Sequence, residues 1–127
     1  NPAFQAHPNK ASGLSVVALV TPDVETHTTF ATAFTGVAPH FEGEQVSFPL
    51  ARGRLDLMSL DDAGEAYGSV EIASDQTAFA AFGVRVEDVR MQAHHLDAAK
   101  IPYQRIGSRL VVPASAAFGV AIAFEAT

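Results

Sequence analysis

The stretch AAFGVRVEDV (residues 80–89) decides the fold, because it repeats the pattern of VVALVTPDV (residues 16–24) about 65 residues later. Each copy is an apolar run that leads through a polar or acidic residue into a segment with helical spacing. Each is followed by further short apolar runs, which end with GRLDL (residues 53–57) in the first half and GVAIAF (residues 119–124) in the second. A repeat of this length indicates two copies of one supersecondary unit. The order of elements predicts βαβββ in each half.

The first half is predicted to hold a strand at 15–20, a helix that ends at Gly36, and strands at 44–50 and 54–60. We expect Thr21 to cap this helix, with Pro22 at its first position. The second half is predicted to hold a strand at 79–86, a helix at 88–100 and strands at 103–105, 109–112 and 120–124. Apolar spacing assigns the buried positions of the two helices. They are Val24, Phe30, Ala31 and Phe34 in the first helix, and Val89, Ala93, Leu96 and Ala99 in the second.

The chain divides into an N-terminal arm or inter-domain segment (residues 1–12) and one domain (residues 13–127). Module one covers 13–60, a linker covers 61–78, and module two covers 79–127. The linker is predicted from a shift in composition, since it holds five carboxylates, two glycines and many small residues.

Composition excludes several classes of function. Eight basic residues face fourteen acidic ones, giving a net charge of −6, which argues against binding to a nucleic-acid backbone. No apolar run approaches the roughly 20 residues of a membrane helix. The chain has no cysteine, so it has no disulfide, thiolate zinc site or cysteine nucleophile. We expect a cytoplasmic protein, and the start at Asn1 suggests a processed product or part of a longer chain.

With its repeated plan, its strand–Pro–Asp–helix opening and its ending LVVP (110–113) and GVAIAF (119–124), the chain resembles the vicinal oxygen chelate superfamily, which includes glyoxalases, bleomycin-resistance proteins and extradiol dioxygenases. The resemblance covers residues 13–127. It implies an α+β fold in which two βαβββ modules form a curved mixed sheet around a cleft. The segment FQAHPN (4–9) is similar to the inter-domain segment of larger glyoxalase-like proteins, which implies the C-terminal domain of such a protein.

Members of this superfamily hold a divalent metal on the cleft face, usually with His on the first strand and Glu on the last strand of each module. The resemblance places these positions at Val16, Asp56, Ala81 and Ala123. Three of the four are aliphatic, whereas a divalent ion needs several donors that converge on it. A register shifted by one residue would add only Glu125, on the same face as Ala123. We therefore predict no metal and no cofactor.

The same strand alternation predicts what lines the cleft, because side chains two residues apart share a face. Small residues would leave room there, and two arginines would supply positive charge for a small anionic or apolar ligand. The alternative is that the charges are paired at the surface and the small residues only allow close packing. The predicted ligand-binding set is Val16, Arg54, Asp56, Met58, Ala81, Gly83, Arg85 and Ala123.

No catalytic residue is predicted. The adjacent pair His94 and His95 would point about 100° apart on a helix, which does not suit one metal ion. The serines lack a Gly-x-Ser-x-Gly elbow and the glycines form no phosphate loop. Tyr103 is a candidate proton donor if it faces the cleft, although packing on an edge strand is the simpler interpretation. His7 in the arm is a candidate contact to a partner domain.

Three functions are compatible with these observations, and whether the chain is an enzyme stays open. The leading hypothesis is a metal-free domain that binds a small molecule or serves as an accessory domain of a larger glyoxalase-like protein, packed against an N-terminal sibling domain. The second is a lyase, isomerase or dioxygenase whose metal site lies elsewhere or in another register. The third is a structural homodimerisation module.

Overall fold

A computed structural model describes residues 6–127, so residues 1–5 of the predicted arm lie outside the described part. It confirms the two βαβββ modules. Module one comprises β1 (Gly13–Val20), α2 (Val24–Thr35), β2 (His40–Glu42), β3 (Gln45–Leu50) and β4 (Gly53–Met58). Module two comprises β5 (Ala78–Val86), α4 (Val89–Ala98), β6 (Gln104–Ile106), β7 (Arg109–Val112) and β8 (Ala121–Ala126). Helix α3 (Leu60–Tyr67) connects them, and a single 3-10 turn (Ala114–Ala116) precedes β8.

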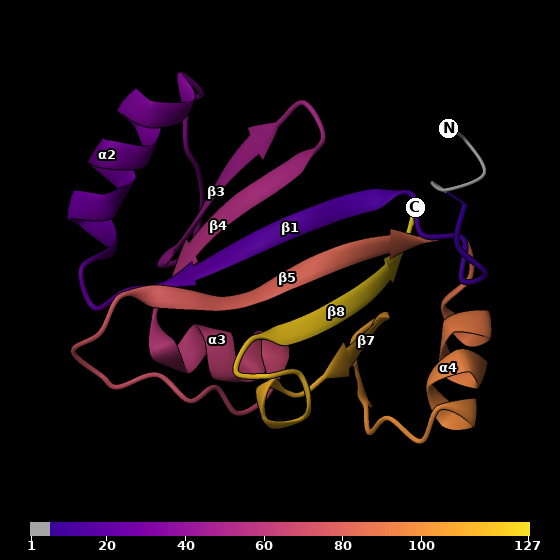
Figure 1. The fold of residues 1–127 in the computed structure, drawn as a ribbon. Coiled ribbons are helices and arrows are strands. Elements are labelled where there is room, and N and C mark those ends of the chain that lie inside the picture. The colour runs from indigo at the N-terminus through magenta and orange to yellow at the C-terminus, as the bar shows by residue number, and fades with distance from the viewer. Residues whose placement is uncertain (1–5) are drawn as a thin grey trace.

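The strands of both modules join in one mixed sheet in the order β2-β3-β4-β1-β5-β8-β7-β6 (Figure 1). In each module the first strand runs parallel to the last, β1 to β4 and β5 to β8. The modules meet where β1 pairs antiparallel with β5. The two first strands therefore lie at the centre of the sheet, and the corresponding positions of the two modules lie on either side of this junction.

The two faces of the sheet carry different helices. Successive residues of each strand point to opposite faces, so each face has its own set of packed side chains. On one face, Leu19 and Leu57 pack toward α2, and Ile122 and Phe124 pack toward α4. On the other face, α3 lies against β1 and β5. The residues buried there are mostly small: Ala18, Val20, Met58, Ala63, Tyr67, Ala80, Ala81, Val111, Ala121 and Ala123.

Helix α2 begins two residues later than predicted. Its N-cap is Asp23, whose carboxylate accepts a hydrogen bond from the Thr26 amide at 3.1 Å. Thr21 is instead buried beneath the helix start, where its hydroxyl accepts hydrogen bonds from the Asp23 amide and from Thr77. Because Asp23 caps the helix, the Thr21 hydroxyl is free to connect the end of β1 to the loop before β5 through its hydrogen bond with Thr77.

The prediction that Phe30 and Phe34 are buried is wrong. Their side chains are 66% and 79% exposed, and their rings stack on the surface with centroids 5.8 Å apart. The helix contacts the sheet through the row that contains Val24 and Ala31, and the two phenylalanines lie roughly 60–120° round the helix from these residues. In α4, Val89 and Leu96 are buried as predicted and Ala93 is half-buried, but the prediction that Ala99 is buried is wrong: it is the exposed C-cap residue at the end of the helix.

The segment predicted as a linker (61–78) begins with helix α3. Ser59 caps it by accepting a hydrogen bond from the Asp62 amide at 3.1 Å, and Asp61 and Asp62 lie in its first turn, where carboxylates oppose the helix dipole. Ala63 and Tyr67, four residues apart, form its buried face. The acidic, glycine-containing composition is thus that of a short capped helix rather than of irregular chain.

In the described part of the chain, no helix is long and apolar enough to cross a membrane.

Candidate functional site

The four positions that the resemblance assigns to a metal lie on the face covered by α3, and all are buried. Ala18 of β1 is paired with both Asp56 of β4 and Ala81 of β5. Gly83 of β5 is paired with Val16 and with Ala123 of β8. The predicted positions therefore come together beside the junction of the two modules. None of Val16, Asp56, Ala81 and Ala123 is more than 2% exposed.

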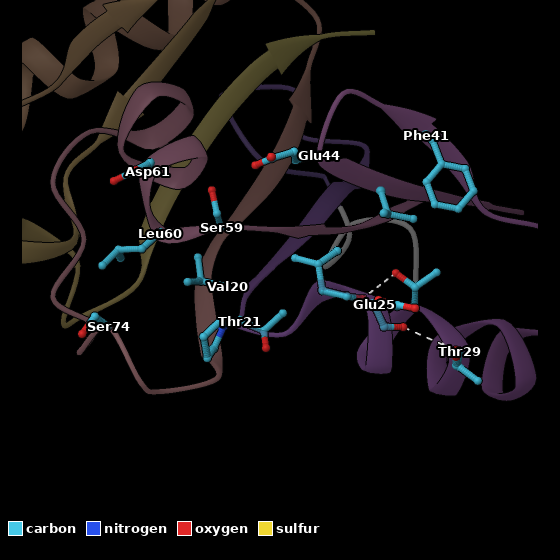
Figure 2. A pocket seen from close by; sticks show the side chains of 14 residues that line it. Val20, Thr21, Glu25, Thr29, Phe41, Glu44, Ser59, Leu60, Asp61 and Ser74 are labelled. Atoms are coloured by element: carbon cyan, nitrogen blue, oxygen red, sulfur yellow. Dashed lines mark hydrogen bonds between the residues drawn. The ribbon is translucent and has the colours of Figure 1, made fainter.

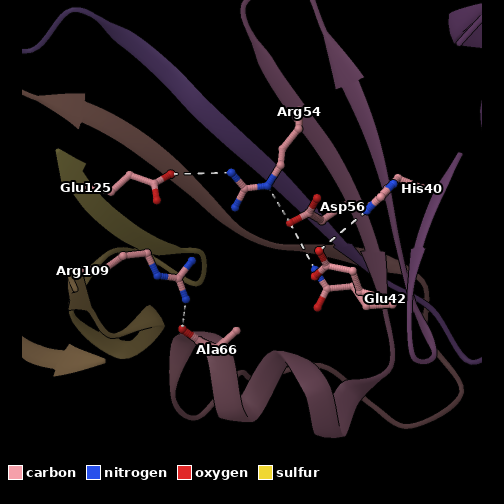
Figure 3. Close-up of polar contacts among 8 residues, drawn as sticks. His40, Glu42, Arg54, Asp56, Ala66, Arg109 and Glu125 are labelled. Atoms are coloured by element: carbon pink, nitrogen blue, oxygen red, sulfur yellow. Dashed lines mark hydrogen bonds and ion pairs between the residues drawn. The ribbon is translucent and has the colours of Figure 1, made fainter. Parts of the chain in front are cut away.

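A guanidinium group lies between two carboxylates at this place (Figure 3). Arg54 Nε donates to Asp56 Oδ2 at 3.1 Å, and Arg54 Nη1 lies 3.9 Å from Glu125 Oε1. Gln45 Nε2 also donates to Asp56 Oδ2, at 3.4 Å. Partial burial opposes the charge of Arg54, but the carboxylates of Asp56 and Glu125 outweigh it and raise the pKa of the guanidinium above its usual value. The cluster joins the last strands of both modules.

The residues present do not fit a divalent metal. Val16, Ala81 and Ala123 have no donor atom in their side chains, and a metal needs at least three protein ligands. Asp56 Oδ1 and Glu125 Oε1 are buried without a hydrogen-bond partner, so two orphaned oxygens are present. However, Arg54 already supplies a positive charge beside them. Across residues 6–127, no three side chains of His, Cys, Asp and Glu gather closely enough to hold a metal.

Helix α3 fills much of the remaining space on this face with Tyr67. The tyrosine is 1% exposed and packs with the cluster of small residues around Ala81 and Ala123. Arg109 of β7 lies over its ring, with Cζ 4.7 Å from the centroid, and donates from Nη2 to the Ala66 carbonyl at 2.6 Å. Burial raises the pKa of the Tyr67 hydroxyl, against the opposing influence of Arg109. The small residues make room for a side chain of the protein itself.

Six of the eight residues predicted to bind a ligand are buried, and only Arg54 and Arg85 are partly exposed. Met58 belongs to the α3-covered core. At Gly83 an added Cβ would clash with Ser15 Oγ and lie 2.7 Å from Val16 Cγ1, so this position is closed by its neighbours. The structure thus brings the predicted residues onto one face, and the ligand-binding role assigned to them stays a prediction.

The other candidates from the sequence lie away from this face. The Tyr103 hydroxyl donates to Asp97 of α4 at 2.9 Å, which places it on the opposite side of the sheet from α3. His94 and His95 are exposed on α4. His7 is exposed, and its Nδ1 lies 2.7 Å from Asn9 Oδ1.

A pocket of about 930 Å³ opens at the ends of the parallel strands β1 and β4, between α2, the β2–β3 turn and the start of α3 (Figure 2). Its apolar walls are Val20, Pro22, Val24, Phe41, Val46 and Leu60. Hydroxyl groups line the rest. They belong to Thr21, Thr28, Thr29, Ser59 and Ser74.

Three carboxylates complete the lining of this pocket, and they come from three different elements. Glu25 belongs to α2, Glu44 to the β2–β3 turn and Asp61 to α3, and no basic residue lines the pocket. Sequence reasoning missed this site because it assigned Asp61 to a linker. The Ser59 cap followed by two aspartates was the available signal for a helix there. That α3 starts beside α2 depends on the tertiary fold.

No protein-family model and no curated protein matches the chain. Solved structures do match it. Methylmalonyl-CoA epimerase from Mycobacterium tuberculosis has a TM-score of 0.68 at 13% identity, over 99% of this chain and 95% of that one. A methylmalonyl-CoA epimerase in complex with methylmalonyl-CoA and NH4+ has a TM-score of 0.65 at 10% identity, over 93% and 96%.

The Mn(II)-bound glyoxalase from Novosphingobium aromaticivorans also matches, with a TM-score of 0.65 at 10% identity. The match covers 92% of this chain but 39% of the glyoxalase chain. These likenesses confirm the glyoxalase-like fold that the resemblance implied. At such low identity they establish the fold and not an activity.

Proposed function

We propose that the chain is a metal-independent domain of the vicinal oxygen chelate fold that binds a small molecule and serves as an accessory domain of a larger protein. The observation that carries this proposal is the Arg54 guanidinium between Asp56 and Glu125, beside the positions where the family holds its metal. Arg54 thus lies next to the place where relatives hold a metal ion, and a guanidinium group has a different chemistry from a metal ion.

A guanidinium neutralises carboxylates but does not replace a metal ion as a catalyst. It stays protonated at physiological pH, and it has no open coordination position at which a substrate oxygen or a water could be activated. The aliphatic side chains of Val16, Ala81 and Ala123 have no donor atoms that could bind a metal ion in place of Arg54. The cluster therefore serves the fold by joining β4 and β8, and the metal chemistry of the family has no support from these side chains.

The pocket between α2 and α3 is the better ligand site. Its volume of about 930 Å³ lies in the range of roughly 300–1,000 Å³ that is usual for small-molecule sites. It combines apolar walls with hydroxyl and carboxylate groups, whereas on the face that carries the predicted ligand-binding residues Tyr67 of α3 packs onto the small residues around Ala81 and Ala123. We accordingly assign ligand binding to this pocket in place of the cleft expected from the sequence.

An apolar surface supports the accessory role. A second hollow, of about 450 Å³, lies over the junction of β1 and β5, where Leu14 is 50% and Phe79 59% exposed. Val17, Phe82 and Val120 also line it. Apolar surface of this kind is typical of a contact between domains. In this proposal an N-terminal sibling domain covers the hollow, and a second copy of the chain is the alternative.

A screen of small molecules by thermal shift tests the proposal, with a variant that blocks the pocket. Thr28→Trp places an indole in the pocket from α2, and Thr26→Trp, on the same helix but not among the lining residues, is the matched control. We expect compounds that stabilise the wild-type protein and Thr26→Trp but not Thr28→Trp. Compounds that stabilise all three proteins equally would contradict the assignment of the pocket.

The competing function, a metalloenzyme of the same superfamily, would rest on the two carboxylates of Asp56 and Glu125. It requires at least one further ligand and the displacement of Arg54. Metal titration separates the two functions directly.

A further inference from the structure

We infer that the pocket between α2 and α3 selects a small organic cation, namely a primary or secondary amine with an apolar body. This inference rests on the proposed function, since it names the class of ligand for that pocket. The observations that carry it are the cavity itself, the charges of its lining and the origin of those charges.

The charge of the lining is entirely negative. Glu25, Glu44 and Asp61 line the pocket and no Lys, Arg or His does. Within residues 6–127, the ion pairs of the protein involve none of these three carboxylates. The three side chains are exposed and come from three elements, so an anionic ligand would meet uncompensated negative charge and a cation would be attracted to the pocket.

The starts of two helices also face this region, and they act in the opposite sense. An N-terminus carries roughly half a positive charge, so α2 and α3 together contribute about +1 against three carboxylates, which leaves about −2. Glu25 and Asp61 lie in first turns, where a carboxylate also stabilises its own helix. Glu44 lies outside both helices, in the β2–β3 turn, and has no such role. The negative charge of the three carboxylates is thus larger than the positive charge of the two helix N-termini.

The apolar walls define the rest of the ligand. Phe41, which is 64% exposed, lies on one side of the pocket, and Leu60 lies on the α3 side (Figure 2). An aromatic or branched aliphatic group of a ligand would cover these side chains, and the hydroxyl groups of the lining can accept hydrogen bonds from an ammonium group. A small hydrated metal ion would leave the apolar walls uncovered.

Three probes of equal body and different charge test the inference by isothermal titration calorimetry. They are phenethylamine, 2-phenylethanol and 3-phenylpropionate. We expect phenethylamine to bind most tightly, its affinity to fall as salt is raised, and the affinity to drop about threefold to fivefold in each of Glu25→Gln, Glu44→Gln and Asp61→Asn. Glu65→Gln is the matched control, because Glu65 is exposed on α3 but does not line the pocket. Circular dichroism confirms that each variant is folded.

The outcomes separate this inference from the proposed function. If 2-phenylethanol or 3-phenylpropionate binds more tightly than the amine, and Thr28→Trp abolishes that binding, the cation preference is wrong and the pocket assignment stands. Amine binding that persists in Thr28→Trp overturns both. Amine binding that is lost in Thr28→Trp but unchanged in all three acid variants overturns the electrostatic part. Absence of binding by all three probes overturns both the inference and the ligand-binding function of the pocket.

Discussion

Replacing Arg54 by methionine removes the guanidinium group that lies between two carboxylates, while it keeps a long apolar side chain on β4. The Asp56 carboxylate is 3% exposed, and the variant leaves it with Gln45 Nε2, at 3.4 Å, as its remaining partner. Asp56 Oδ1 already has no partner. The variant therefore leaves a buried carboxyl group with one weak hydrogen bond and no cation beside it.

The size of the effect follows from the exposure of the two partners. Breaking a fully buried ion pair costs about 3–5 kcal/mol, and breaking an exposed pair costs about 0–1 kcal/mol. Arg54 is 37% exposed, which lets solvent screen part of its interaction, whereas Asp56 is not exposed. We therefore expect Arg54→Met to lower the free energy of unfolding by about 2–3 kcal/mol.

A double-mutant cycle in urea at pH 7 measures this effect. Combining Arg54→Met with Asp56→Leu removes the unpaired charge together with its partner, so the double variant should unfold within about 1 kcal/mol of the wild type. Arg90→Met is the control, because its pair with Asp88 is largely exposed, and we expect a change below about 0.5 kcal/mol. If Arg54→Met matches the control, or if the double variant is no more stable than Arg54→Met, the reasoning about this cluster is refuted.

Three further changes test the face covered by α3. Because burial raises the pKa of Tyr67, the folded protein holds this proton more tightly than the unfolded chain. The stability that the protonated Tyr67 hydroxyl contributes is complete below about pH 10 and is lost as the pH rises further. Tyr67→Phe should therefore flatten the decline in the free energy of unfolding in urea above about pH 10. Parallel declines of the variant and the wild type would contradict this. Gly83→Ala should destabilise by about 1–3 kcal/mol through its contact with Ser15, and Ser15→Ala should recover part of that loss; thermal unfolding without any recovery would contradict the stated clash. Arg109→Ala should lower stability by about 1–2 kcal/mol in urea and speed amide exchange in α3, and unchanged exchange would show that Arg109 does not fasten the helix.

The sequence was sufficient for seven of the eight strands in residues 6–127, because their signals are periodic and occur twice, but it gave no strand at β2 (His40–Glu42), a short and exposed edge strand. Alternation placed Arg54 and Asp56 on one face, and the repeat placed Val16 and Ala81 in corresponding strands; the pairing in the structure agrees with both. The fold class followed from these patterns, since a repeated apolar pattern specifies the strands that carry it.

Features that depend on tertiary contacts could not be read in this way. Phe30 and Phe34 fit an apolar stripe, but α2 turns a neighbouring row toward the sheet, so apolar character alone chose the wrong side. Tyr67 gave no sign that it would pack on the face predicted to be a cleft, because the Ser59 cap and the aspartates after it indicate a helix but not the face of the sheet that the helix covers. The pocket joins α2, a turn and α3, and only their packing brings Glu25 and Asp61 to the same cavity.

If Arg54 takes the place of the metal ion that vicinal oxygen chelate proteins hold, the protein will bind no divalent metal there, and a metal titration of the chelator-treated protein tests this. Zn²⁺, Ni²⁺, Mn²⁺ and Fe²⁺ are added to the wild-type protein in a calorimeter while thermal stability is followed. We predict no saturable one-to-one binding and no stabilisation. A true site would raise the free energy of unfolding by about 2.7 kcal/mol at a hundredfold excess over its dissociation constant. One-to-one binding with that stabilisation, lost in Asp56→Asn, would contradict the account and identify a metalloprotein.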